Sequence, residues 1–175
     1  MSDLSALLVI DMQNGLLHAP QPPFQRERLL ANVTRLIQTA RHTQTPVYFA
    51  QHTGAEGSPV ADGSPLWQLA AELPLAESDR RFNKTRPSCF FDTPLLAELR
   101  LAKVARLVIV GMKTEYCVDT TCRAAADLGF DVVLVSDAHS TTDGAVLSAE
   151  QIVAHHNATL AGPFVTLMAT DEVEF

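Results

Sequence analysis

The sequence predicts an α/β fold, a three-layer sandwich in which a six-stranded, mainly parallel sheet carries helices on both faces. Short, nearly continuous apolar runs alternate along the chain with segments of helical periodicity. Strands that are buried on both faces of a parallel sheet have this composition. Polar residues follow the apolar runs, as at Asp11, where parallel strands reach the ligand-binding edge of their sheet. We expect the Rossmann-like strand order 3-2-1-4-5-6.

The first half of the chain predicts three strands and one helix. The expected elements are strands at 5–10, 47–51 and 80–83 and a helix at 26–41. The helix is predicted because its apolar residues recur at helical spacing, namely Leu29, Leu30, Val33, Leu36, Ile37 and Ala40. Residues 52–65 are rich in Gly, Ser and Pro, which predicts a long loop, and such loops in compact domains are usually functional or mobile.

The second half continues the alternation. The expected elements are helices at 94–101, 117–128 and 148–161 and strands at 107–110, 132–135 and 164–168. Gly129 is expected to end the helix at 117–128. We detect no internal repeat and no low-complexity segment, and therefore predict a single domain over residues 1–175.

Composition excludes several classes of function. The chain has 175 residues, 47% hydrophobic and 19% charged, with a net charge of −7. An acidic chain with scattered Lys and Arg does not favour a nucleic-acid or anionic-membrane partner. No apolar run approaches the length of a membrane span. Three cysteines, an odd number, without a signal peptide fit a reducing cytoplasm, so we predict a cytoplasmic protein without disulfides.

Cys117 is the strongest candidate for a catalytic residue. An apolar strand ends at Gly111, and Cys117 follows within a few residues at the start of a predicted helix. If Thr114 is the N-cap, the thiol lies in the first helical turn, where free N–H groups and the helix dipole favour a thiolate. The same N–H groups can receive an oxyanion. The alternative is a buried cysteine that acts as a small hydrophobe.

Three segments together resemble the isochorismatase-like cysteine hydrolase superfamily. They are residues 7–14 (LLVIDMQN), 82–90 (FNKTRPSCF) and 114–118 (TEYCV). The resemblance extends over nearly the whole chain, and the superfamily includes isochorismatase, nicotinamidase and N-carbamoylsarcosine amidohydrolase. Isochorismatase itself acts on a vinyl ether, whereas the cysteine, lysine and aspartate of this chain resemble the amidase branch, which implies an enzyme that hydrolyses C–N bonds other than peptide bonds in a small-molecule substrate.

Asp11, Lys84 and Cys117 match the catalytic triad of this superfamily. In the order 3-2-1-4-5-6 the strands before Asp11 and Cys117 are neighbours at the point where the order reverses, so both side chains would face one crevice. Asp11 is expected to act as the base for the thiol, and Lys84 to stabilise both anions. Taken singly, Asp11 could cap a loop and Lys84 could be a surface lysine. Their occurrence as a set favours catalysis.

The resemblance also implies an oxyanion hole formed by the backbone N–H groups of Lys113 and Cys117, with a cis peptide bond between Met112 and Lys113. Family members mostly have a small or aliphatic residue at the position of Lys113.

We expect no metal and no cofactor. Nicotinamidases of the superfamily bind a metal through an Asp-x-His pair after the second strand, and residues 50–54 (AQHTG) lack that aspartate. Asp137 and His139 have the same spacing after the fifth strand, but two ligands alone do not make a site.

Aromatic residues supply candidates for the substrate pocket. Trp67 lies in the long loop and either lines the pocket or caps the core or a subunit contact. Phe24 and Tyr116 are further candidates. Apolar Leu66 and Leu69 lie near Trp67, and an exposed apolar patch is rare on a monomer, so we predict a homo-oligomer, a dimer or tetramer.

These observations favour a metal-independent cysteine hydrolase of a small amide or ureido substrate that forms an acyl-enzyme. The alternatives are a nicotinamidase or isochorismatase-type hydrolase and a non-catalytic, redox-responsive member of the fold.

Overall fold

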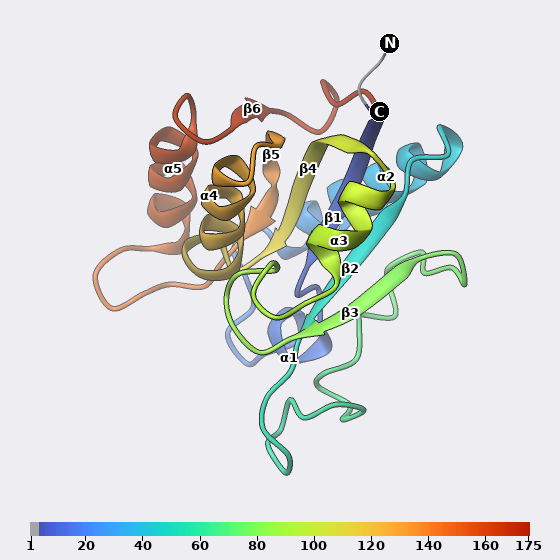
Figure 1. Cartoon of the computed structure of the whole chain (residues 1–175). Coiled ribbons are helices and arrows are strands. Elements are labelled where there is room, and N and C mark those ends of the chain that lie inside the picture. Colours follow the sequence, from blue (N-terminus) through green and yellow to red (C-terminus); the bar gives the residue numbers. More distant parts are fainter. Residues whose placement is uncertain (1–3) are drawn as a thin grey trace.

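The protein folds around one six-stranded sheet in which all neighbouring strands are parallel (Figure 1). The structure is a computed structural model that describes residues 4–175; residues 1–3 of the predicted domain lie outside the described residues. The strands are β1 (Leu4–Ile10), β2 (Val47–His52), β3 (Arg80–Lys84), β4 (Val104–Met112), β5 (Asp131–Ser140) and β6 (Thr166–Met168). Their order, β3-β2-β1-β4-β5-β6, confirms the predicted fold class.

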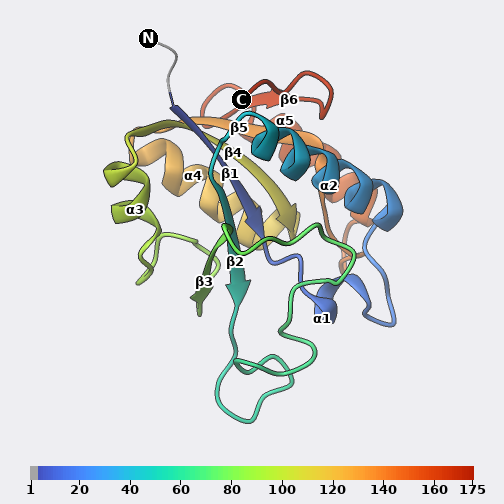
Figure 2. The ribbon, with the colours of Figure 1, turned by 90° about the vertical axis from the view of Figure 1, so that its right-hand side faces the viewer.

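Helices cover both faces of the sheet. They are α1 (Asn14–Leu17), α2 (Arg26–His42), α3 (Leu95–Leu101), α4 (Asp119–Asp127), α5 (Ala149–Leu160) and a π-helix, η1 (Thr114–Val118). Figure 2 shows α2 on one side of the sheet and α3 and α4 on the other. The chain between β2 and β3 extends below the sheet as the long loop that its composition predicts.

The core consists of two apolar layers that the sheet separates. Side chains of consecutive strand residues point to opposite faces, so Leu7 and Val9 of β1 pack toward α2, whereas Leu8 and Ile10 pack toward α3 and α4. The buried face of α2 is the predicted one, with Leu29, Val33, Leu36, Ile37 and Ala40 inside. Strands that are apolar on both faces are therefore required at the centre of this sheet.

Gly111 brings the ends of β1 and β4 close together. It pairs with Ile10 in the ladder and adopts a φ of 118°. A Cβ atom at this position would overlap the backbone oxygen of Ile10, so only glycine fits. This close approach lies at the point where the strand order reverses.

The structure differs from the predicted elements at several points. The helix expected at 117–128 is divided into η1 and α4, because the Val118 N–H donates to the Lys113 carbonyl five residues earlier, at 3.2 Å. β4 and β5 are longer than the apolar runs that predicted them, and α1 was not predicted. Among residues 4–175, no helix is both long enough and apolar enough to cross a membrane.

Candidate active site

The side chains of Asp11, Lys84 and Cys117 meet at the carboxyl edge of the sheet. Lys84 Nζ lies 2.9 Å from Asp11 Oδ2 and 3.2 Å from Cys117 Sγ. Nζ also donates to the Arg86 carbonyl at 3.3 Å. The ammonium group therefore contacts both the carboxylate and the thiol, and the three residues that the sequence singled out form one cluster.

Strand ends hold the two charged members of this cluster. Asp11 directly follows β1 in a left-handed conformation (φ 50°), and its N–H continues the ladder by donating to the Ala50 carbonyl at 3.0 Å. Lys84 is the last residue of β3 and is 2% exposed. Its long stem reaches past β2 because the carboxyl ends of β3, β2 and β1 lie side by side.

Cys117 lies in η1, and the predicted helix cap is wrong in one respect. The N-cap residue is Lys113, which has extended backbone angles, and no side chain caps the N–H groups. Thr114 is the first residue of the helix, and its hydroxyl contacts His139 Nδ1 at 2.8 Å. Cys117 is partly exposed, so its sulfur is accessible from one side.

Burial dominates the electrostatics of the charged pair. Burial raises the pKa of Asp11 above its ordinary value, although the nearby Lys84 opposes this shift. Burial also disfavours the charged form of Lys84, but the Asp11 carboxylate and the neighbouring cysteines outweigh it and raise the pKa of Lys84. The ammonium is thus retained, and the carboxyl group is more basic than an aspartate in water.

The thiol does not behave as the helix-start argument predicted. Burial and the adjacent Asp11 charge raise the pKa of Cys117 to about 12, so the free site holds a thiol and not a thiolate. Among residues 4–175, Asp11 Oδ1 has no hydrogen-bond partner. A basic carboxylate with an available oxygen beside a protonated thiol is suited to proton transfer at the moment of attack.

The backbone next to the thiol follows the geometry that the resemblance implies. The Met112–Lys113 peptide bond is cis. The Lys113 N–H donates to no carbonyl among the loop and turn hydrogen bonds of residues 4–175. An N–H group without an internal acceptor beside a cysteine is a candidate donor to an oxyanion.

A cavity of about 380 Å³ opens onto Asp11 and Cys117. Besides these two residues, its lining is formed by Gln13, Gly15, Leu16, His52, Val60, Leu66, Pro87, Lys113 and Tyr116. Of the three aromatic residues predicted for the substrate pocket, only Tyr116 lines this cavity. The long loop contributes Val60 and Leu66 as an apolar wall, so the cavity has the size and the partly apolar lining that are typical of a small-molecule site.

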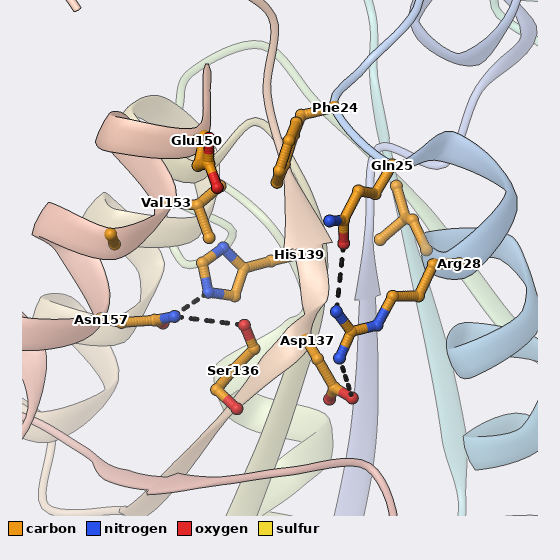
Figure 3. Close-up of a pocket in the computed structure, with 11 residues that line it drawn as sticks. Phe24, Gln25, Arg28, Ser136, Asp137, His139, Glu150, Val153 and Asn157 are labelled. Carbon is orange, nitrogen blue, oxygen red and sulfur yellow. Dashed lines mark hydrogen bonds and ion pairs between the residues drawn. The ribbon is translucent and has the colours of Figure 1, made fainter. Parts of the chain in front are cut away.

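The predictions for Trp67 and Phe24 are corrected by the structure. Trp67 does not line this cavity but a neighbouring one, and its indole N–H donates to Thr53 Oγ1 at 2.9 Å. Phe24 lines a different cavity, of about 350 Å³, between the start of α2, the end of β5 and α5 (Figure 3). Loop residues of this type are placed by tertiary contacts that the sequence pattern does not reveal.

His139 links this second cavity to the cysteine-bearing helix. Asn157 donates from Nδ2 to the Ser136 carbonyl at 3.1 Å, so its Oδ1 faces His139 Nε2 at 2.8 Å (Figure 3). Nε2 must therefore carry the proton, and Nδ1 accepts from the Thr114 hydroxyl. Burial lowers the pKa of His139 to about 4, which keeps the ring neutral.

Comparison with known proteins identifies the family. The model of the isochorismatase domain matches residues 5–172, nearly the whole chain. The chain belongs to the isochorismatase family. A solved structure of an isochorismatase family protein is 36% identical, with a TM-score of 0.88, and the match covers 94% of this chain and 98% of that one.

Relatives in the isochorismatase family include hydrolases with named substrates. Streptothricin hydrolase from Streptomyces noursei is 34% identical over 80% of this chain, which spans only 51% of that protein's length. The ureidoacrylate amidohydrolase RutB from Variovorax paradoxus is 29% identical over 82% of this chain and 71% of its own length. The present protein is a hydrolase of this family, which includes amidases that act on C–N bonds.

The end of β2 lacks the Asp-x-His pair that a metal site of this type would need. An Asp-x-His pair that ends at His52 would need its aspartate at position 50, where this chain has Ala50, and the amide of the intervening Gln51 donates to the Trp67 carbonyl at 3.2 Å. Asp137 accepts from Thr170, whereas His139 is engaged as described above. In the described part of the chain, no three His, Cys, Asp or Glu side chains converge as a potential metal site.

Gln13 is a site residue that sequence reasoning missed. It is 3% exposed and lines the cavity beside Asp11 and Cys117. Its amide donates to the carbonyls of His52 and Trp67 at 3.0 and 2.7 Å and accepts from the His52 N–H at 2.9 Å. It thereby ties the long loop to the end of β2. Its position two residues after Asp11, in the same signature segment, is a signal that could have identified it.

Proposed function

We propose that this protein is a metal-independent cysteine amidohydrolase that cleaves a small amide or ureido substrate. The observation that carries the proposal is the contact of one buried ammonium, Lys84 Nζ, with both Asp11 and Cys117. A structural ion pair would not require a partly exposed thiol at its centre. A nucleophile with its base and a charge that stabilises both does require this arrangement.

The first half of the reaction forms an acyl-enzyme. Asp11 removes the proton from Cys117 as the sulfur attacks the substrate carbonyl carbon. The N–H groups of Lys113 and Cys117 stabilise the oxygen of the tetrahedral intermediate. Asp11 returns its proton to the leaving nitrogen as the C–N bond breaks, which releases ammonia or an amine and leaves a thioester on Cys117.

The second half restores the enzyme. Asp11 takes a proton from a water molecule that attacks the thioester carbon, and the sulfur leaves and regains its proton as the acid product departs. Lys84 remains protonated throughout, because its ion pair raises the pKa of its ammonium. Its charge lowers the energy of every state in which the thiolate or the Asp11 carboxylate is ionised.

Residue types at the end of β2 support metal independence. A nicotinamidase-type metal site requires a carboxylate two residues before the histidine, where this chain has Ala50, and a methyl side chain cannot bind a metal. The burial of His52 lowers its pKa, and a neutral imidazole alone does not hold a metal. The raised pKa of Cys117 also disfavours a redox sensor, since oxidation-sensitive cysteines are usually acidic.

The proposal includes the oligomeric state of the protein and its location in the cell. Leu69 is buried in the core, so it does not belong to the exposed apolar patch that the sequence predicted beside Trp67. Leu66 and Tyr116, which are 45% and 57% exposed beside the cavity, support a homo-oligomer, either a dimer or a tetramer. Light scattering at micromolar concentration tests this, and a monomeric mass would contradict it. The three cysteines are free and two of them are buried, which supports a reducing, cytoplasmic location. The chain is proposed to form a single domain that needs no disulfide.

A hydrolysis screen tests the function. Small primary amides, ureido acids and nicotinamide are offered to the protein, and ammonia release is measured before and after exhaustive chelation with EDTA. We expect turnover of at least one class that survives chelation and is lost in Cys117→Ala. Cys122→Ala, which removes a buried thiol elsewhere on the same helical segment, is the matched control. Activity that EDTA abolishes and zinc, iron or manganese restores would refute metal independence.

A further inference from the structure

Lys113 brings a second positive charge to the catalytic cavity. It lines the cavity together with Cys117, and its Nζ donates to Thr142 Oγ1 at 3.0 Å. Thr142 follows β5, so the contact joins the end of that strand to the residue before η1. Among residues 4–175, no carboxylate lies within ion-pair distance of the Lys113 ammonium, in contrast to Lys84.

The charge of Lys113 is not balanced within the cavity. Asp11 and Lys84 form an ion pair and cancel each other. Burial lowers the pKa of His52, so this ring is neutral at pH 7, and Cys117 is a neutral thiol. The remaining wall is largely apolar. A chain with a net charge of −7 thus has a catalytic cavity with an excess of one positive charge.

An unpaired ammonium beside an apolar wall is suited to one substrate class. We infer that Lys113 selects substrates that carry a carboxylate, so that the physiological substrate is a small amide or ureido acid with one negative charge. The hydroxyl of Thr142 accepts from the ammonium without neutralising its charge. A positive charge beside an apolar wall attracts a substrate carboxylate more strongly than it would in bulk water, because the effective dielectric constant is lower. This inference rests on the proposed function, since it assigns the substrate of the same nucleophile.

The competing explanation is that Lys113 only braces the chain after β5 through its bond to Thr142. Such a brace would depend on the shape and hydrogen bonds of the side chain and would have no effect on the charge preference of the cavity. The two explanations therefore differ in a measurable ratio, namely the reactivity of Cys117 toward an anionic and a neutral reagent of the same size.

Iodoacetate and iodoacetamide supply that comparison without knowledge of the substrate. In both reagents the Cys117 sulfur displaces iodide from a CH₂ carbon, and only the neighbouring group differs, a carboxylate or an amide. The rate constant for alkylation of Cys117 is measured for each reagent by peptide mass spectrometry. Cys89 and Cys122 serve as internal references because both are fully buried.

We expect Lys113→Met to lower the iodoacetate-to-iodoacetamide rate ratio by on the order of tenfold. Lys113→Arg, which keeps the charge, should retain most of the ratio. Arg35→Gln, which removes an exposed positive charge on α2, should leave the ratio unchanged. Added salt should lower the ratio in the wild type and have little effect on it in Lys113→Met.

The outcomes separate this inference from the function on which it rests. If iodoacetamide labels Cys117 rapidly and the iodoacetate-to-iodoacetamide rate ratio is the same in the wild type and Lys113→Met, Cys117 remains the proposed nucleophile and the assignment of an anionic substrate is wrong. If iodoacetamide labels Cys117 no faster than Cys89, the proposed nucleophile fails, and the assignment to an anionic substrate fails with it.

Discussion

The neutral, buried His139 predicts a specific loss of stability at mildly acidic pH. The ring is 4% exposed, and burial lowers its pKa to about 4 from an ordinary value of 6.5. The unfolded chain therefore binds a proton on this residue between pH 6.5 and 4, and the folded protein does not. Folding becomes less favourable as the pH falls through this window, because proton uptake stabilises only the unfolded state.

The magnitude follows from the size of the shift. One pKa unit corresponds to about 1.4 kcal/mol, so the full effect is about 3 kcal/mol once the pH is below 4. At pH 5.5 the unfolding free energy should already be lower by about 1.4 kcal/mol than at neutral pH, and at pH 4.5 by about 2.5 kcal/mol. The groups that face the ring, including Asp137 and His156, modulate this value only secondarily.

Urea unfolding at pH 7.5, 6.5, 5.5 and 4.5 measures the effect when the wild type is compared with His139→Asn. Other titrating groups, such as Asp11 with its raised pKa, act in the opposite direction but are present in both proteins. The stability advantage of the wild type should shrink by the amounts given above as the pH falls. His155→Asn, which changes an exposed histidine of α5, should show no such trend. A difference between wild type and His139→Asn that does not vary with pH would refute the reasoning.

Two further predictions concern the site and its support. Asp11→Asn and Lys84→Met should each reduce kcat/KM by at least about 100-fold, and the double variant should lose far less than the product, because the residues act as one unit; multiplicative losses would contradict the triad. Circular dichroism must accompany these assays, since removal of Lys84 leaves a buried carboxylate unpaired. Gly111→Ala should lower the unfolding free energy by at least about 2 kcal/mol in urea, because its φ of 118° and the nearby Ile10 oxygen exclude a Cβ atom; an unchanged midpoint would refute this.

The strand order and the meeting of Asp11 with Cys117 were predictable for the same physical reason. Strands that are apolar on both faces need cover on both sides, which leaves few possible topologies. Once β1 and β4 are adjacent at the reversal, Asp11 and Cys117 must share one edge. Lys84 required the family resemblance, because a lysine at a strand end carries no pattern of its own.

The pocket and the ionisation of the thiol were not predictable in the same way. The wall of the cavity comes from the long loop after β2, whose path depends on contacts such as those of Gln13 with His52 and Trp67. Hydrophobic periodicity in the sequence does not reveal such loop contacts. Cys117 is not a thiolate in the free site, because burial and the neighbouring Asp11 raise the pKa of its thiol and outweigh the helix dipole.

The covalent intermediate is the most direct test of the central claim. A substrate found by ammonia release is mixed with the protein, the reaction is stopped with acid during turnover, and the intact mass and peptide map are determined. We expect an added mass equal to the acyl group, located on Cys117, and neither adduct nor turnover in Cys117→Ala. Ammonia release by Cys117→Ala at the wild-type rate, or an adduct on a different residue, would contradict the proposed mechanism.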